Sequence, residues 1–295
     1  MALLKVENLT VTIGGVTLLD GVSFAIGKGQ RLGLIGEAGA GKSLTALAIL
    51  GLLPRGAVMT GSLSFDDTPM PAGMAEKAAL RGKRIGTLLR DAAETLSPLH
   101  SIGAQIADAL PPGDDKAKAT EQLLRDVGVD PAAARWYPGD LDAAERRRVA
   151  LSLAIAGKPD LLILDEPAAG LDLIEQRRII DLIERLCTEH KVSLLLISHD
   201  LKTLALLCTK IVVLKAGKVV EAGEKPDIFG HPRHEFTRGV LSAGRNRART
   251  LMRTPIGGTL LDVRNVTCRD RRPDRSLFEP RPLVVALDGV SFSIR

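Results

Sequence analysis

The sequence predicts an α/β fold built on a parallel sheet, with a short second unit after it. Three apolar runs of strand type, at 31–35, 161–167 and 192–197, run into residues suited to phosphate or metal chemistry. A segment at 43–53 carries apolar residues at helical spacing. A chain of 295 residues is long for one domain and short for two large ones, which favours one α/β unit with an appendage.

Composition narrows the class of protein. Hydrophobic residues make up 45% and charged residues 25%, which excludes wholesale disorder, collagen and coiled coil. Aromatic residues are only 3%, so a base-stacking surface for nucleic acid is disfavoured. A net charge of +5 suits an anionic ligand or a membrane surface better than a DNA groove.

The spacing of the cysteines and the first residues of the chain give no sign of a secreted protein. Cys187, Cys208 and Cys268 show no CxxC spacing, so we expect no zinc site or disulfide framework. Lys5 and Glu7 interrupt the apolar run that a signal peptide needs, and no later apolar stretch reaches the roughly 18 residues of a membrane span. We expect a chain that is soluble or docks on a membrane.

The first chemical motif is GEAGAGKS, between the strand-like run at 31–35 and the helical segment. Strand, glycine-rich loop and helix in this order are typical of a P-loop, in which backbone N–H groups surround phosphates. Lys42 would supply charge to the β- and γ-phosphates, and Ser43 would ligate Mg²⁺. The predicted nucleotide-binding residues are Gly36, Glu37, Ala38, Gly39, Ala40, Gly41, Lys42, Ser43 and Leu44.

The run LLILDEP at 161–167 ends in two carboxylates. A central parallel strand would deliver them to the sheet edge where the phosphates lie. We expect Asp165 to hold Mg²⁺ and Glu166 to act as general base on the attacking water.

The run at 192–197 is followed by His199. Histidine titrates near neutral pH and can donate to a γ-phosphate, so His199 is the second predicted catalytic residue. A lone histidine after a strand is more often structural, and this one gains weight from following a second strand at the same edge.

The chain contains a partial internal repeat. Leu3–Thr10 (LLKVENLT) resembles Leu260–Thr267 at an offset of 257, and Leu19–Ile26 (LDGVSFAI) resembles Leu287–Ile294 at an offset of 268. The two matches frame one hairpin, with an 11-residue insertion in the second copy. The arginine-, proline- and glycine-rich stretch at 244–259 is expected to be a basic linker, and it lacks the interleaved aromatic residues of a nucleic-acid site.

The P-loop, LDEP at 164–167 and SHD at 198–200, in this order, resemble the nucleotide-binding domain of an ATP-binding cassette (ABC) transporter. The match covers Leu3 to about Ala243. Finer strings resemble the peptide, opine and nickel importer branch: KRIG at 83–86, LSPLHSIGAQI at 96–106, GKVVEAG at 217–223 and HPRHEFTRGVLSA at 231–243. Some members of that branch carry two fused cassettes, and the repeat from Leu260 resembles the start of a second one.

The resemblance implies an α/β P-loop NTPase with a RecA-like core, an antiparallel β-subdomain and a helical subdomain at about 90–156. Its domains would be an ABC domain at 1–243, the linker at 244–259 and a truncated start of a second ABC domain at 260–295. Two cassettes would bind two MgATP head to tail, each site pairing one P-loop with the other cassette's signature motif. ATP closes such a dimer and hydrolysis reopens it.

The partners implied are separate membrane subunits, a second ABC domain and, indirectly, a periplasmic solute-binding protein, with no nucleic acid. The chain would lie at the cytoplasmic face of the inner membrane.

The chain departs from the family at the signature motif, where LSGGQ is replaced by Leu141, Asp142, Ala143, Ala144 and Glu145. The family's serine and glycines hold the opposing γ-phosphate, whereas Asp142 places a carboxylate there and the alanines add Cβ atoms. Two unit charges about 4 Å apart at an effective dielectric constant of about 20 repel by about 4 kcal/mol. A tolerated variant with a shifted loop is the alternative.

Two further family positions differ. Arg90 falls where the family has its Q-loop glutamine, and arginine can pair with phosphate but cannot ligate a cation. Ile13 falls near the position of the aromatic residue that stacks on adenine, and it offers apolar contact only.

The predicted function is therefore ATP hydrolysis coupled to uptake of peptides or a related solute (opine, nickel) through separate membrane subunits. The degenerate signature predicts asymmetric ATP sites and poor hydrolysis by a homodimer. The alternative is a non-catalytic nucleotide-binding subunit or remnant.

Overall fold

The computed structural model describes residues 2–71, 77–90, 96–246, 258–271 and 283–294. Contacts divide the chain into one unit at 1–245 and another at 246–295, and each is described by itself.

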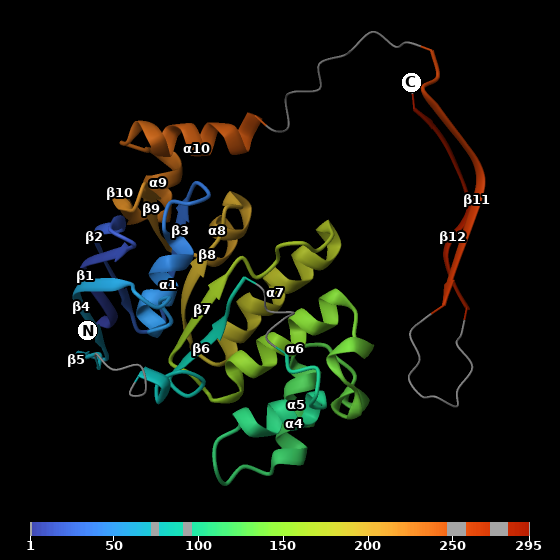
Figure 1. Cartoon of the computed structure of the whole chain (residues 1–295), viewed down its shortest axis with the longest axis horizontal. Coiled ribbons are helices and arrows are strands. Elements are labelled where there is room, and N and C mark those ends of the chain that lie inside the picture. The colour runs from blue at the N-terminus through green and yellow to red at the C-terminus, as the bar shows by residue number, and fades with distance from the viewer. Residues whose placement is uncertain (1, 72–76, 91–95, 247–257, 272–282, 295) are drawn as a thin grey trace. The chain divides into compact units, whose positions relative to one another are not determined.

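A six-stranded sheet forms the centre of the first unit (Figure 1). Its strand order is β10-β9-β3-β8-β7-β6; β9, β3, β8, β7 and β6 are parallel, and β10 is antiparallel to β9. The bounds are β3 Arg31–Gly36, β6 Ile85–Leu88, β7 Leu161–Asp165, β8 Ser193–Ile197, β9 Lys210–Lys215 and β10 Lys218–Glu224. The three strands predicted from apolar runs are confirmed, and they are neighbours in the order β3-β8-β7.

A smaller antiparallel sheet carries the N-terminal hairpin. Its order is β2-β1-β4-β5, with β1 Ala2–Ile13, β2 Val16–Gly27, β4 Val58–Phe65 and β5 Thr68–Pro69. This sheet corresponds to the predicted β-subdomain.

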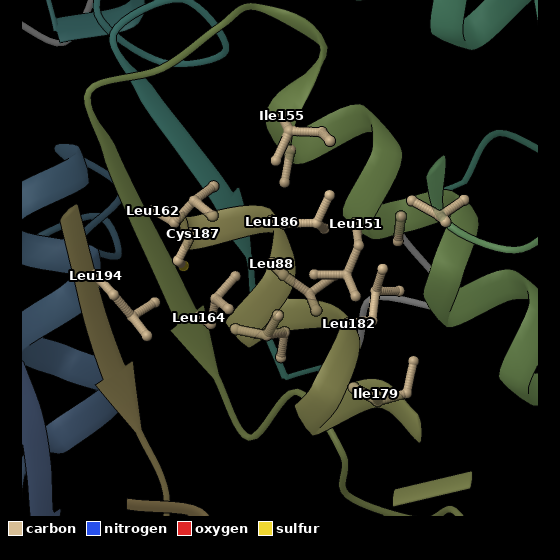
Figure 2. Packing of buried hydrophobic residues seen from close by; sticks show 14 of the residues in the cluster. Leu88, Leu151, Ile155, Leu162, Leu164, Ile179, Leu182, Leu186, Cys187 and Leu194 are labelled. Carbon is tan, nitrogen blue, oxygen red and sulfur yellow. The ribbon is translucent and has the colours of Figure 1, made fainter. Parts of the chain in front are cut away.

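Apolar residues of the central strands alternate between two buried clusters, as the two-residue period of a strand requires. Leu161 and Ile163 join the cluster beneath the antiparallel sheet, together with residues of helix α1 (Lys42–Leu50). Leu162 and Leu164 join the cluster on the other face. There they meet Leu151 and Ile155 of α6 (Ala143–Ala156) and Ile179, Leu182 and Leu186 of α7 (Leu173–Glu189) (Figure 2). The sheet is therefore covered on both faces.

Helix α1 is shorter than predicted. It ends at Leu50 because Gly51 adopts φ 68 and its N–H bonds back to the last turn, so the predicted continuation to Leu53 is wrong.

The stretch predicted as the helical subdomain contains α4 Ile102–Ala109, α5 Lys116–Asp126, two 3₁₀ turns at Pro131–Arg135 and Pro138–Asp140, and α6. Short polar side chains cap these helices: Ser101 caps α4 and Asp115 caps α5, each accepting a backbone N–H.

The remaining helices of the first unit are α8 Leu201–Leu207, α9 Lys225–Gly230 and α10 Glu235–Asn246. Helix α10 runs into the predicted linker, so residues 244–246 are helical, and 247–257 lie outside the described residues.

The second unit is the hairpin that the repeat predicts, with β11 Leu261–Arg271 antiparallel to β12 Leu283–Ile294. The predicted insertion falls largely at 272–282, outside the described residues.

Candidate active site

The loop between β3 and α1 has a backbone that only glycine fits at two positions. A Cβ on Gly36 would lie 2.2 Å from the carbonyl oxygen of Leu214. Gly41 adopts φ 99, and its Cβ would lie 2.4 Å from Leu19 Cδ2. Gly36 and Gly41 are therefore required by packing as well as by ligand approach.

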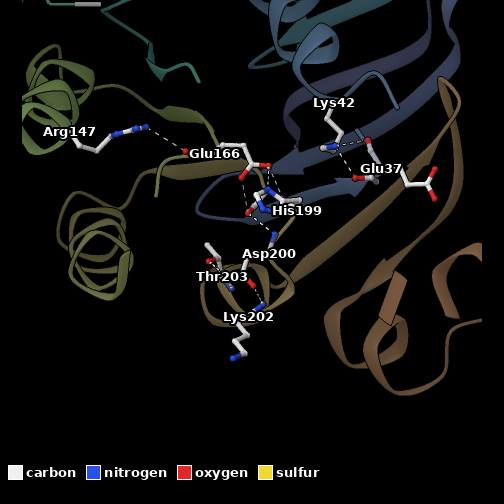
Figure 3. A network of polar contacts seen from close by, with 10 residues as sticks. Glu37, Lys42, Arg147, Glu166, His199, Asp200, Lys202 and Thr203 are labelled. Atoms are coloured by element: carbon white, nitrogen blue, oxygen red, sulfur yellow. Dashed lines mark hydrogen bonds and ion pairs between the residues drawn. The ribbon is translucent and has the colours of Figure 1, made fainter. Parts of the chain in front are cut away.

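Lys42 begins α1 and turns its ammonium back over this loop (Figure 3). Its Nζ donates to the carbonyl oxygens of Gly36 at 2.8 Å and Glu37 at 2.9 Å. Burial lowers the pKa of Lys42, and the nearby carboxylates Glu166 and Asp165 only partly offset this. The ammonium is held where a phosphate can replace the two carbonyls as its partner.

Asp165 ends β7 beside Ser43, and 2% of it is exposed. Burial raises the pKa of its carboxyl, and a hydrogen bond with Ser43 opposes that rise. Its Oδ1 is buried and has no hydrogen-bond partner among the described residues. A buried carboxylate oxygen left unpaired beside a hydroxyl is a donor set that fits a hard divalent cation such as Mg²⁺.

Glu166 and His199 form a pair at the ends of β7 and β8 (Figure 3). Glu166 Oε1 accepts the backbone N–H of His199 at 2.9 Å and lies 2.7 Å from its Nδ1. Ser198 Oγ donates to Glu166 Oε2 at 3.4 Å. Contacts from Ser198 and His199 thus hold the Glu166 carboxylate in place. The His199 side chain itself is 66% exposed.

These groups line one pocket of about 740 Å³. Its walls include all of the predicted P-loop residues except Ala40, whose side chain is buried in the core cluster. Arg90, Asp165, Glu166 and His199 complete the polar wall. The structure therefore brings the predicted catalytic, metal and phosphate residues together.

Ile13 is not among the residues that line this pocket, and it packs instead against the cluster under the antiparallel sheet. Leu18 of β2, which is 41% exposed, supplies an apolar wall. Sequence reasoning missed it, although an apolar side chain at an outward-facing strand position was the available signal.

The degenerate signature lies at the start of α6. Leu141 is buried, and Asp142 is the N-cap residue: its Oδ1 accepts the N–H of Glu145 at 2.7 Å. Glu145 Oε2 accepts the N–H of Asp142 at 3.0 Å, which completes a capping box. Ala143 and Ala144 form the first helical turn. The helix N-terminus thus already carries a carboxylate of its own chain.

Within the described residues, no helix is long and apolar enough to span a bilayer.

The fold and the pocket define a P-loop ATPase. The family model described as "ABC transporter" matches residues 19–169. The chain is 36% identical over 256 residues to the dipeptide transport ATP-binding protein DppD of Escherichia coli, covering 82% of this chain and 78% of that protein. It is 37% identical over 256 residues to the peptidoglycan transport ATP-binding protein YejF of Agrobacterium fabrum, covering 82% of this chain and 47% of that protein. The chain therefore belongs to the ABC transporter family and carries its ATP-hydrolysing domain.

A solved structure supports the fold. The dimeric ATP-binding cassette MJ0796, in a post-hydrolysis state bound to ADP and Pi, aligns with a TM-score of 0.66 at 22% identity, covering 75% of this chain and 98% of that one.

Proposed function

We propose that this chain is the ATP-hydrolysing subunit of an importer that takes up peptides or a related solute through separate membrane subunits. The observation that carries the proposal is the convergence of Lys42, Asp165, Glu166 and His199 on one pocket. Relatives named for dipeptide and peptidoglycan transport support peptides as the substrate class ahead of opines or nickel. The site would lie at the cytoplasmic face of the inner membrane, with a periplasmic solute-binding protein acting indirectly.

The chain's own residues supply binding and proton transfer. Lys42 and the backbone N–H groups of the loop hold the β- and γ-phosphates of ATP. Ser43 and Asp165 would hold Mg²⁺, which neutralises phosphate charge when bound. Glu166 accepts a proton from the attacking water, while His199 keeps the Glu166 carboxylate oriented. Arg90, which lines the pocket, would contact phosphate.

We propose that a second ABC domain with an intact signature completes this site. In a head-to-tail pair, each P-loop faces the partner's signature motif. The capping box of Asp142 and Glu145 supports the asymmetry, because the N–H of Glu145 is already occupied and the carboxylate would face a phosphate. Two copies of this chain alone would then hydrolyse ATP poorly.

We also propose that 260–295 is the opening of such a second domain, joined through the basic stretch at 244–259. Matching strand register in the two hairpins supports this assignment. The YejF relative, of which the chain covers 47%, is consistent with it.

The test restores the signature in the full chain with Asp142→Ser, Ala143→Gly, Ala144→Gly and Glu145→Gln combined. ATP turnover by the purified protein should rise at least about tenfold, since removing the repulsion lowers the barrier by more than about 1.4 kcal/mol. Glu166→Gln in the restored chain should abolish the gain. Robust turnover by the unmodified chain, with no gain on restoration, would contradict the asymmetry.

The substrate class is tested separately, with the chain and its membrane subunits in vesicles. A peptide-loaded binding protein should stimulate hydrolysis. Stimulation by nickel or an opine instead would contradict peptide uptake.

A further inference from the structure

The turn that follows β7 holds Glu166 in an unfavourable backbone conformation. Glu166 adopts φ 50, in the left-handed region that residues with a Cβ rarely occupy. Its N–H donates to the carbonyl oxygen of Ile197 on β8 at 2.9 Å. Its carbonyl oxygen accepts the N–H of Ala169 at 3.1 Å, which closes the turn. A general base in such a turn needs outside contacts to stay in place.

Arg147 of α6 provides such contacts from the helical side (Figure 3). Its guanidinium donates to the carbonyl oxygen of Ala169 at 3.1 Å and reaches that of Glu166 at 3.5 Å. Only 9% of Arg147 is exposed. A buried guanidinium therefore bridges the two ends of the turn, while His199 and Ser198 hold the Glu166 carboxylate.

The two neighbouring arginines have other partners. Arg146 donates to the carbonyl oxygen of Leu141, within the signature segment, at 2.5 Å. Arg148 pairs with Glu175 at the start of α7. Arg147 is thus the arginine of this run whose described contacts lie on the Glu166 turn.

We propose that Arg147 is a positioning residue for Glu166: it clamps the turn at 166–169 and so sets the place of the carboxylate that receives the proton. The proposal rests on the proposed function only for its effect on turnover. Because Arg147 lies on the helix that Asp142 caps, it also ties the signature segment to the general base of the same chain. In the proposed head-to-tail pair these two elements would serve different nucleotides.

The first readout needs no ATP turnover. The backbone N–H of His199 donates to Glu166 Oε1, so its exchange with solvent reports whether the carboxylate is in place. In Arg147→Met of the full chain, this N–H should exchange at least about tenfold faster, as expected for loss of a charge-assisted contact. The N–H of Thr203, which donates to the N-cap residue Asp200 in the first turn of α8, should keep its rate. Arg147→Lys, which keeps a donor and the charge, should restore part of the protection.

Arg148→Met is the matched control, because it removes the next arginine of the same helix while Glu175 keeps Arg178 as a partner. It should leave the His199 N–H unchanged. Equal acceleration at His199 and Thr203 in Arg147→Met, or the same acceleration at His199 in Arg148→Met, would overturn the proposal by showing general loosening.

The second readout uses the chain with the restored signature. Arg147→Met should lower kcat about 10- to 100-fold while the Kd for ATP changes less than about twofold, since the phosphate loop is untouched. In a Glu166→Gln background the same change should have no further effect on kcat. An equal loss in both backgrounds would overturn the proposal. A restored chain without turnover would count against the proposed function alone, because the exchange rates still test Arg147.

Discussion

The two hairpins of this chain share a register but not an environment. At the offsets of the repeat, the pairings of β1 and β2 from Leu4–Ile26 onward recur in β11 and β12. Leu4–Ile26 recurs as Leu261–Ile294, Val6–Phe24 as Val263–Phe292, Leu9–Val22 as Val266–Val290, and Val11–Leu19 as Cys268–Leu287. The three irregular steps of the second ladder fall at the same places as three of those in the first. The register of each hairpin is therefore determined by the strand sequences and their local contacts.

The polar details of the bulge recur as well. Asn8 adopts φ 50, and its counterpart Asn265 adopts φ 49. The N–H of Asn8 donates to Ser23 Oγ at 2.8 Å, and that of Asn265 donates to Ser291 Oγ at 2.8 Å. Asparagine tolerates left-handed backbone better than most residues, which makes it a local determinant of the bulge.

Burial separates the two copies. Leu9 is fully buried under the central sheet and α1, whereas its counterpart Val266 is 41% exposed. Phe292 and Ile294 are also exposed, while Ile26 is buried. Strand pairing is therefore encoded locally in this fold, and most of the stabilisation of a hairpin comes from the core that covers it.

The largest expected difference is in hydrogen exchange of the full chain. Amides paired in β1 should exchange only through global unfolding, with protection of at least about 5 kcal/mol. Amides paired in β11 should show less than about 2 kcal/mol, since an isolated two-stranded hairpin is marginal in water. Exchange followed by NMR at two protein concentrations measures both. Strong protection in β11 that grows with concentration would show that a second copy covers it.

The next difference concerns core truncation at matched positions. Leu9→Ala should lower the free energy of unfolding in urea by about 2–5 kcal/mol, because it leaves a cavity in a packed core. Val266→Ala should change it by less than about 0.5 kcal/mol. Leu9→Val is the control that puts the same residue at both positions. A loss above about 1.5 kcal/mol for Val266→Ala would mean that this face is covered.

The fold followed from the sequence where local pattern and packing agree. The runs ending at Ile35, Asp165 and Ile197 are buried strands because each is apolar on both faces, as a covered parallel sheet requires. The end of α1 was misplaced because apolar residues continue to Leu53, while the backbone of Gly51 decides the stop.

The sequence predicted those site residues that belong to a recognisable motif. Lys42, Asp165 and Glu166 belong to strings with a fixed order, and the structure gathers them in one pocket. Arg147 and Ser198 act by touching Glu166 from a distant helix or the next strand end, and no spacing in the sequence reveals such contacts. Ile13 of β1 and Leu18 of β2 show the same limit, because the apolar character of a strand residue does not tell which face of the sheet it lies on.

A smaller effect is expected at the glycine of each hairpin. Gly21 adopts φ 67 and Gly289 adopts φ 59, so alanine should cost about 1 kcal/mol at either site through backbone strain. Urea unfolding measures Gly21→Ala, and exchange of the β11 amides measures Gly289→Ala. Gly230→Ala, in open space without positive φ, is the control and should stay within about 0.5 kcal/mol. No cost at Gly289 would show that the second hairpin does not hold this backbone in solution.

The smallest effect should come from the serines that close the two bulges. Ser23→Ala and Ser291→Ala each remove the acceptor of one exposed asparagine N–H, which water can replace, so each should cost only about 0.5–1 kcal/mol. The first is measured by urea unfolding and the second by exchange of the Asn265 N–H.

Thr10→Val and Thr267→Val provide a second matched pair, because they remove the hydroxyl groups that accept the N–H of Gly21 and Gly289. Equal costs in the two hairpins would establish that the bulge is a local unit, because the core covers only the first copy. A cost confined to Ser23 would place the determinant of the bulge in the core, and the shared register would then need another cause.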